Sequence, residues 1–486
     1  MKHLLALLIS LSIASRVFAT LSGAMVWEVR SNGSDLNSGG YKTGASGTDY
    51  TQQATAQFVG TDGTSAASTT FTSATAVFNS TVVGNTLRIN AGSGATLGVY
   101  EITGYTSPTT ITLDAACGTV YDATFKVGGA LATIGKVGSA TANQGMVAGN
   151  LMCVKAGTYS IGASDTVACS GTATSPIRIV GYNTVRPTLT TVGDGYLGRT
   201  GVNKNKTLDT SNMPLYAYGA FGLYGSSSTF VVVENIKFTS SIAGNAVAIG
   251  GKSFIKSCYA STSSTSASSV GIAATGTGAN VIDCDAFLTA ASGAASGAGI
   301  NIGVGIALGN HVSCGATTAP GIRLSGFGAS VVIDNVVYSG GGFGIYVSAV
   351  NASGNVFGNT VTGCTDGINV ITANVGGVMV IANNCITDNS GYGINIVSAS
   401  NAALLYGNRT RDNASGAINS GTDWVNASNW QSVTTDTGGA TSDYLNPTSN
   451  DYSLIKSSPA SFSGVPAGNS IGAFQSVSPM QGGGFF

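Results

Sequence analysis

A phrase of about 25 residues that repeats from about residue 230 onwards limits what this chain can fold into. Each repeat holds a short apolar strand, a polar residue, a second short strand, a loop, and a Gly-led third strand. The polar position falls at Asn235, Ser257, Cys284, Asn310, Asn335, Asn359, Asn384 and Asn408. The glycine position falls at Gly244, Gly271, Gly299, Gly321, Gly344, Gly367, Gly393 and Gly416. Gaps in both columns lie between 22 and 28 residues, and such a period is the signature of a solenoid.

The physics of such a coil explains why the repeats must stack. Three short strands cannot bury their apolar residues alone, whereas coils stacked at about 4.8 Å pair their backbones and close a continuous core. An Asn at a tight corner tolerates the left-handed backbone conformation, and stacked Asn side chains can hydrogen-bond from coil to coil. The third strands alternate apolar, polar, apolar, as in Ile345-Tyr346-Val347. This pattern predicts an all-β chain whose main part is a parallel β-helix.

Composition and charge narrow the possible partners. Charged residues make up only 8% of the chain and hydrophobic residues 43%, so apolar content argues against disorder. The chain has no basic tract, and we expect no nucleic-acid partner. Apart from His311 near Cys314, it has no Cys or His pair at metal-ligand spacing, so we expect no metal and no cofactor. Eight cysteines permit disulfides without fixing a pairing. Because several fall on the repeat, we favour buried, unpaired thiols over a full disulfide set.

Particular phrases of the repeat resemble a known superfamily. The run Ile381-Ala382-Asn383-Asn384-Cys385-Ile386, followed by Gly393-Ile394-Asn395-Ile396, resembles the coil of right-handed parallel β-helix proteins of the pectin lyase type. The resemblance covers residues 230–420 and extends less clearly back to about 128. It implies a right-handed solenoid of the type found in secreted bacterial and phage-associated proteins. The same solenoid carries lyases, hydrolases, epimerases, adhesins and phage tailspikes, so the resemblance indicates fold rather than activity.

The chain divides into four predicted parts. Residues 1–19 read as a signal peptide, with Lys2 before an apolar run and small residues at the cleavage position, although a buried N-terminal segment is the alternative. Residues 20–127 form a small β-rich domain that caps the solenoid, 128–420 form the β-helix, and 421–486 form a C-terminal cap and flexible tail. No later stretch reaches the ~20 apolar residues of a membrane span. We therefore expect a secreted or cell-surface protein.

The third strands also predict a site. Their outward positions should form a row with side chains roughly 5 Å apart. Amide, guanidinium and phenol groups suit sugar hydroxyls and carboxylates. The predicted substrate-binding residues are Asn301, Arg323, Tyr346, Asn369 and Asn395 of this row, with Arg411 from a neighbouring loop. Asp366 and Asp388 flank the row and are the catalytic candidates, since two carboxylates can act as acid and base in glycoside cleavage. A merely solvated solenoid face accounts for the same polar residues.

Two functions stay open from the sequence. One is a secreted β-helix that binds a polysaccharide or cell-surface glycan and, if it is an enzyme, cleaves it as a lyase or glycoside hydrolase. The other is a non-catalytic structural or adhesive rod, on a cell surface or in a phage tailspike-like assembly. No cluster of three or four close carboxylates is visible, which lowers the weight of a calcium-dependent lyase. Assembly into a homo-oligomer is compatible with both.

Overall fold

The structure, a computed structural model, describes residues 21–420 with short gaps, together with β37 (Tyr444–Asn446) and β38 (Asp451–Leu454). The gaps are 139–144, 163, 192, 196–206, 220–221, 242–243, 267, 290–296, 316–317, 327, 349–352, 372–377 and 398–401. The predicted signal peptide and most of the predicted C-terminal part lie outside the described residues. Strands make up nearly all of the regular secondary structure that is described, as the repeat predicts; an example of the little helix is α1 (Gly135–Gly138).

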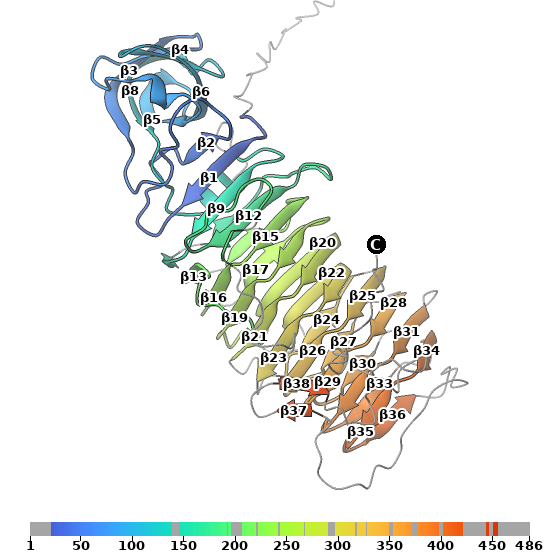
Figure 1. Ribbon diagram of the computed structural model, residues 1–486. Coiled ribbons are helices and arrows are strands. Elements are labelled where there is room, and N and C mark those ends of the chain that lie inside the picture. The colour runs from blue at the N-terminus through green and yellow to red at the C-terminus, as the bar shows by residue number, and fades with distance from the viewer. Residues whose placement is uncertain are drawn as a thin grey trace, which may run out of the picture.

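A small antiparallel barrel stands at the N-terminal end of the molecule (Figure 1). Its strands close in the order β3-β4-β7-β6-β5-β8. They are β3 (Phe58–Ala66), β4 (Thr70–Thr72), β5 (Thr86–Ala95), β6 (Gly98–Ser107), β7 (Thr110–Leu113) and β8 (Gly118–Val127). Aromatic rings fill its core, with Phe71 packed edge-on against Phe125 at 5.0 Å between ring centres. The barrel lies beyond the first coils of the solenoid, where a cap shields strand edges that would otherwise pair with other chains.

Apart from the antiparallel pair of β37 and β38, the rest of the described chain forms a parallel β-helix (Figure 1). Each coil holds up to three strands. The second strands of the coils form a ten-stranded sheet, here called the second-strand sheet. It contains β10 (Thr158–Ile161), β13 (Leu215–Tyr218), β16 (Lys237–Ser240), β19 (Tyr259–Thr262), β21 (Asp285–Leu288), β23 (His311–Gly315), β26 (Val336–Gly340), β29 (Thr360–Thr362), β32 (Cys385–Thr387) and β35 (Arg409–Arg411).

The first and third strands of the coils form the larger sheet. Its first strands include β9 (Leu151–Lys155), β12 (Ile177–Tyr182), β15 (Val231–Glu234), β18 (Phe254–Lys256), β25 (Ala329–Ile333), β28 (Ser353–Phe357), β31 (Val378–Ala382) and β34 (Ala402–Tyr406). Its third strands include β11 (Asp165–Thr166), β14 (Leu223–Gly225), β17 (Asn245–Ile249), β24 (Ile322–Leu324), β27 (Ile345–Val347), β30 (Ile368–Val370), β33 (Tyr392–Ile396) and β36 (Gly416–Ser420). The long strands β20 (Val270–Ile282) and β22 (Ala298–Leu308) serve as the third strand of one coil and the first of the next. Inward side chains from all three strands build one continuous apolar core.

The N-terminal strand belongs to the solenoid rather than to the barrel. Strand β1 (Met25–Val29) runs parallel to β9, with Glu28 opposite Cys153, and antiparallel to β2 (Gly40–Lys42). Its Trp27 is fully buried and donates from Nε1 to Oδ1 of Asn150 at 3.0 Å. The first coil therefore begins inside the range that the sequence assigns to the cap.

The asparagine column forms a buried ladder at the corner between first and second strands. Asn310 donates from Nδ2 to Oδ1 of Asn335 at 2.9 Å. The same bond joins Asn335 to Asn359, Asn359 to Asn384, and Asn384 to Asn408 at 2.8–2.9 Å. Each accepting oxygen also takes the backbone N–H of the Asn in the preceding coil. The predicted coil-to-coil stacking of Asn side chains is confirmed.

One detail of the predicted corner is wrong. The left-handed residue is the one before the ladder Asn, at Gly309, Asp334, Gly358, Asn383 and Gly407. In the two earliest coils the predicted column is one residue early, since Asn235 and Ser257 themselves have positive φ values of 59° and 51°. Strand register puts Ile236 and Cys258 at the ladder position there.

The thiols behave as buried apolar side chains. All eight cysteines are buried and none forms a disulfide bond, which confirms the preference for buried thiols over a full disulfide set. Two of them continue the ladder towards the N-terminus. The backbone N–H of Cys258 donates to Sγ of Cys284 at 3.4 Å, and the N–H of Cys284 donates to Oδ1 of Asn310 at 2.9 Å.

Candidate functional site

The predicted row exists on the third strands. Residues in direct register on successive coils are Asn301, Arg323, Tyr346, Asn369 and Asn395. The row continues to Asn419 on β36. The alternation of apolar and polar residues therefore places these side chains as expected, and their role in binding stays a prediction.

The amides at one end of the row are held by a buried carboxylate. Oδ2 of Asp366 accepts from Nδ2 of Asn369 at 2.8 Å and from Nδ2 of Asn395 at 2.7 Å. Its other oxygen accepts the backbone N–H of Tyr392 at 2.8 Å. Asp366 is only 5% exposed. Its surroundings are those of an anchor that orients two amides from neighbouring coils.

The other end of the row is also tied to the protein. Oδ1 of Asn301 accepts from the hydroxyl of Ser325 at 2.7 Å, and Arg323 donates from Nε to the hydroxyl of Ser348 at 2.9 Å. Tyr346 is buried and stacks on Phe343 with 5.0 Å between ring centres. These contacts order the row, and they also use polar atoms that a ligand would need.

The two remaining predicted site residues lie outside the row. Asp388 is exposed at the corner after β32, with a positive φ of 57°. Arg411 ends β35 in the second-strand sheet and pairs with Asp412, Nε to Oδ2, at 2.7 Å. Asp388 and Asp412 share the left-handed position of this corner on successive coils. The structure therefore gives Asp388 a turn-forming role, and its pairing with Asp366 in catalysis stays a prediction.

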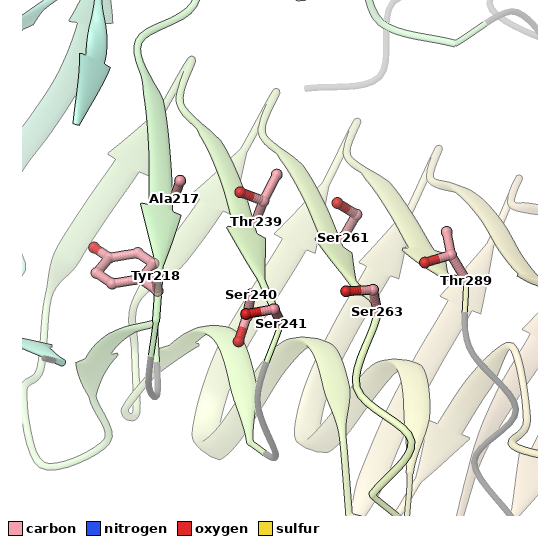
Figure 2. Close-up of a pocket in the computed structure, with 8 residues that line it drawn as sticks. All are labelled: Ala217, Tyr218, Thr239, Ser240, Ser241, Ser261, Ser263 and Thr289. Atoms are coloured by element: carbon pink, nitrogen blue, oxygen red, sulfur yellow. The ribbon is translucent and has the colours of Figure 1, made fainter. Parts of the chain in front are cut away.

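A groove that the sequence analysis missed runs along the outside of the second-strand sheet (Figure 2). Its volume is about 230 Å³. Hydroxyl-bearing side chains dominate its lining, which consists of Ala217, Tyr218, Thr239, Ser240, Ser241, Ser261, Ser263 and Thr289. Figure 2 shows the hydroxyls repeating from strand to strand along the solenoid. Outward positions of the second strands are the signal that could have found it, since Ala217, Thr239 and Ser261 form one register column.

Aromatic rings border this groove on the C-terminal side. Phe287 follows Ser261 in the register column. Its ring lies 5.2 Å from that of Tyr259, which is two residues before Ser261 on the same face. Nζ of Lys237 lies over the Tyr259 ring at 4.9 Å. Burial raises the pKa of Tyr259, so its hydroxyl stays protonated near neutral pH. The name hydroxyl groove is used below for this groove together with Tyr259, Phe287 and Lys237.

Comparison with known families agrees with the repeat. A family model described as periplasmic copper-binding protein (NosD) matches residues 256–456. This match covers the same coils as the asparagine ladder. The described chain is a parallel β-helix, and over these coils it is similar to that family. The match spans about two fifths of this β-helix protein. No curated protein sequence matches it.

Several solved structures are similar to this β-helix protein at low identity. Pectate lyase Pel9A is 14% identical, with a TM-score of 0.46 over 71% of this chain and 92% of that chain. A PL6 family polysaccharide lyase from Pseudopedobacter saltans is 11% identical, with a TM-score of 0.29 over 64% and 92% of the two chains. A GH87 α-1,3-glucanase from Streptomyces thermodiastaticus is 11% identical, with a TM-score of 0.29 over 69% and 75%.

The family description names copper, a metal with definite ligand requirements. Copper sites use clustered His, Cys or Met side chains. Among the described residues, no three His, Cys, Asp or Glu side chains lie close enough to share a metal ion. Burial raises the pKa of Cys258 and of Cys364 to about 12, which disfavours the thiolate that binds metals. The described His, Cys, Asp and Glu side chains therefore form no cluster that could hold copper. In the same residues, no helix is long and apolar enough to cross a membrane.

Proposed function

We propose that this protein is an extracytoplasmic glycan-binding β-helix whose binding site is the hydroxyl groove. The observation that carries the proposal is the column of hydroxyls beside the aromatic rings of Tyr259 and Phe287. The N-terminal signal-peptide pattern and the periplasmic description of the matching family support the location. The absence of a described membrane-spanning helix agrees with it.

The repeat of the groove suits a polymer that lies along the solenoid. Thr239 and Ser261 are register neighbours, so their hydroxyls recur at the spacing of the coils, about 4.8 Å. A hydroxyl both donates and accepts hydrogen bonds, as do the hydroxyls of a sugar. A sugar chain running across the strands therefore meets an equivalent hydroxyl on the two coils of Thr239 and Ser261.

The aromatic border supplies what the hydroxyls lack. Small hydroxyl side chains give little apolar contact, whereas an aromatic ring offers a large surface to the C–H face of a sugar. Tyr259 and Phe287 are both half-buried and held against each other, so little conformational freedom is lost on binding. Lys237 brings a positive charge to the same place, which favours glycans that carry carboxylates.

The row on the third strands is our second proposed glycan contact. Its Asn301, Arg323 and Asn395 are half-buried, and Asp366 orients the amide at position 395. Cleavage by Asp366 and Asp388 is the weaker part of this second proposal, because three donors already occupy the carboxylate of Asp366. A non-catalytic structural or adhesive rod agrees with binding at either place.

The test is binding of the full chain to a panel of acidic and neutral polysaccharides, followed by titration calorimetry on those that bind. Tyr259→Ala and Ser261→Leu should each weaken Kd by roughly tenfold, a change of about 1.4 kcal/mol. Tyr224→Ala is the matched control, since Tyr224 is an exposed tyrosine on a third strand. Binding that is lost only in Arg323→Ala would move the site to the row. No binding to any polysaccharide would overturn the proposed function.

A reducing-end assay on the same polysaccharides separates binding from cleavage. A rod or lectin-like protein releases no new ends. Release that disappears in both Asp366→Asn and Asp388→Asn, while binding persists, would establish the predicted catalytic pair. Circular dichroism of each variant checks that the solenoid is intact.

A further inference from the structure

The outward face of the first strands is unusually apolar. Inward residues of these strands, such as Val281, Val332 and Ile381, belong to the continuous core, so their neighbours on either side point outward. On each of eight successive coils, at least one outward position of the first strand holds a large apolar residue. The apolar members are Val232, Phe254, Ile282, Ile306, Leu308, Val331, Ile333, Phe357, Val380 and Leu404. We call this set the apolar stripe.

The stripe is accessible and nearly free of charge. Phe254 is 39% exposed and Ile306 is 38% exposed, and the other members are half-buried. From β20 to β31, the outward positions between these residues hold Asn280, Asn355 and Ala382 and no ionisable side chain. Glu234 and Lys256, which pair with each other at 3.9 Å, hold the other outward position on the two coils of the stripe nearest the barrel. A contiguous apolar surface of this kind on a secreted protein indicates an interaction surface.

We infer that the apolar stripe is the interface at which two copies of this chain associate side by side. The stripe spans the coils from β15 to β34, a length of roughly 38 Å at the coil spacing, and its two outward positions per strand give a width of about 12 Å with their side chains. That footprint of about 450 Å² per partner is the size of a small interface, which suits a weak, concentration-dependent dimer. Sheet faces pack at about 10 Å, so two such faces can meet directly.

The repeat of the stripe selects a second copy over other partners. Apolar side chains stand in register from coil to coil, so their spacing is that of the strands, about 4.8 Å. A matching surface needs the same spacing over many strands, and a second copy has it by construction. From β20 to β31 the outward positions carry no charged side chain, so an isologous contact across these coils brings no like charges together.

The test measures the mass of the full chain in solution by light scattering after size exclusion. We expect a mass about twice that of the chain, and dissociation to a monomer in Ile306→Lys. Ile371→Lys is the matched control, because Ile371 is also 38% exposed but follows a third strand, β30. The control variant should keep the dimer. Circular dichroism and thermal melting of both variants distinguish loss of association from loss of fold.

A covalent test keeps the inference falsifiable if Ile306→Lys does not fold. Val331→Cys lies near the middle of the stripe, and all eight native thiols are buried. Mild oxidation should therefore link two copies of Val331→Cys and leave the wild type unlinked. A monomeric wild type would overturn the inference. Binding of that monomer to phosphatidylcholine vesicles would assign the stripe to lipid, and a dimer unaffected by Ile306→Lys would place the interface elsewhere.

Discussion

Asn395 and Asp366 lie on successive coils, and Nδ2 of Asn395 donates to Oδ2 of Asp366 at 2.7 Å. The same oxygen accepts from Asn369 at 2.8 Å. A neighbouring pair of amides is therefore fixed by one carboxylate that is itself buried. Such an arrangement stabilises the fold locally whether or not the row binds a ligand, since removing the acceptor would leave enclosed donors without partners.

The first prediction separates the two predicted catalytic carboxylates. Asp366→Asn should lower the free energy of unfolding by about 1–3 kcal/mol, because an amide has one accepting oxygen where the carboxylate has two. Asp388→Asn should change it by less than about 0.5 kcal/mol, because Asn tolerates the left-handed corner at that exposed position. Urea denaturation measures both. Equal, negligible effects would contradict the anchoring role of Asp366.

The second prediction concerns the asparagine ladder. Asn359→Ala removes the acceptor for both the backbone N–H and the Nδ2 of Asn335, and it removes the donor to Asn384. We expect the free energy of unfolding to fall by about 2–4 kcal/mol, because the substitution leaves buried donors and acceptors without hydrogen-bond partners. Asn355→Ala, four residues earlier and exposed, is the control. Similar denaturation midpoints for the two variants would show that the ladder adds nothing to stability.

Much of this fold could be predicted because the information is local and periodic. The alternation in each third strand fixes which side chain points outward, so the register of Arg323 and Tyr346 follows from counting. The ladder could be recognised from Asn310 to Asn408 for the same reason. The prediction of the ladder is wrong at Asn235 and Ser257. The left-handed corner position and the ladder position after it both accept polar residues, and only the backbone φ angle distinguishes them.

Other features depend on partners far away in the chain. The local sequence of Met25–Val29 predicts a strand but not its partner. The structure pairs it with β9, more than 120 residues later, rather than within the cap. The anchoring by Asp366 depends on an amide from the next coil, which no single repeat contains. The hydroxyl groove was missed because Ser and Thr are abundant throughout the chain, so Thr239 and Ser261 gain meaning only beside the rings of Tyr259 and Phe287.

The third prediction extends the ladder by one rung. Cys284 occupies the ladder position, and its Sγ already lies 3.2 Å from the carbonyl of Ile282 and 3.5 Å from that of Ile255. Cys284→Asn should keep the free energy of unfolding within about 1 kcal/mol of the wild type, because its amide finds ladder partners. Cys169→Asn should cost about 1–3 kcal/mol, since Cys169 packs in the apolar core and the new amide lacks a partner there. Equal losses in both would mean that the ladder ends at Asn310.

The fourth prediction links stability to pH through Asp165. Asp165 begins β11 and is only 6% exposed. Burial raises its pKa from 3.8 to about 6, opposed by a backbone hydrogen bond from Gly135. The folded protein therefore holds this proton more tightly than the unfolded chain does. Its stabilising contribution is complete below pH 4 and is lost as the pH rises through about 6.

The size and sign of that effect can be measured against a second carboxyl. The difference between the two pKa values corresponds to at most about 3 kcal/mol, and Asp165→Asn should remove that part of the decline between pH 4 and pH 7. Asp62 is the control with the opposite sign. The hydroxyl of Ser73, at 2.6 Å, lowers the pKa of Asp62, so its contribution is lost as the pH falls. Thermal midpoints across pH 3–8 should therefore change in opposite senses for Asp165→Asn and Asp62→Asn. Parallel curves for the wild type and Asp165→Asn would show that Asp165 titrates normally, in which case the enclosure of its carboxyl between β11 and α1 is looser than the structure indicates.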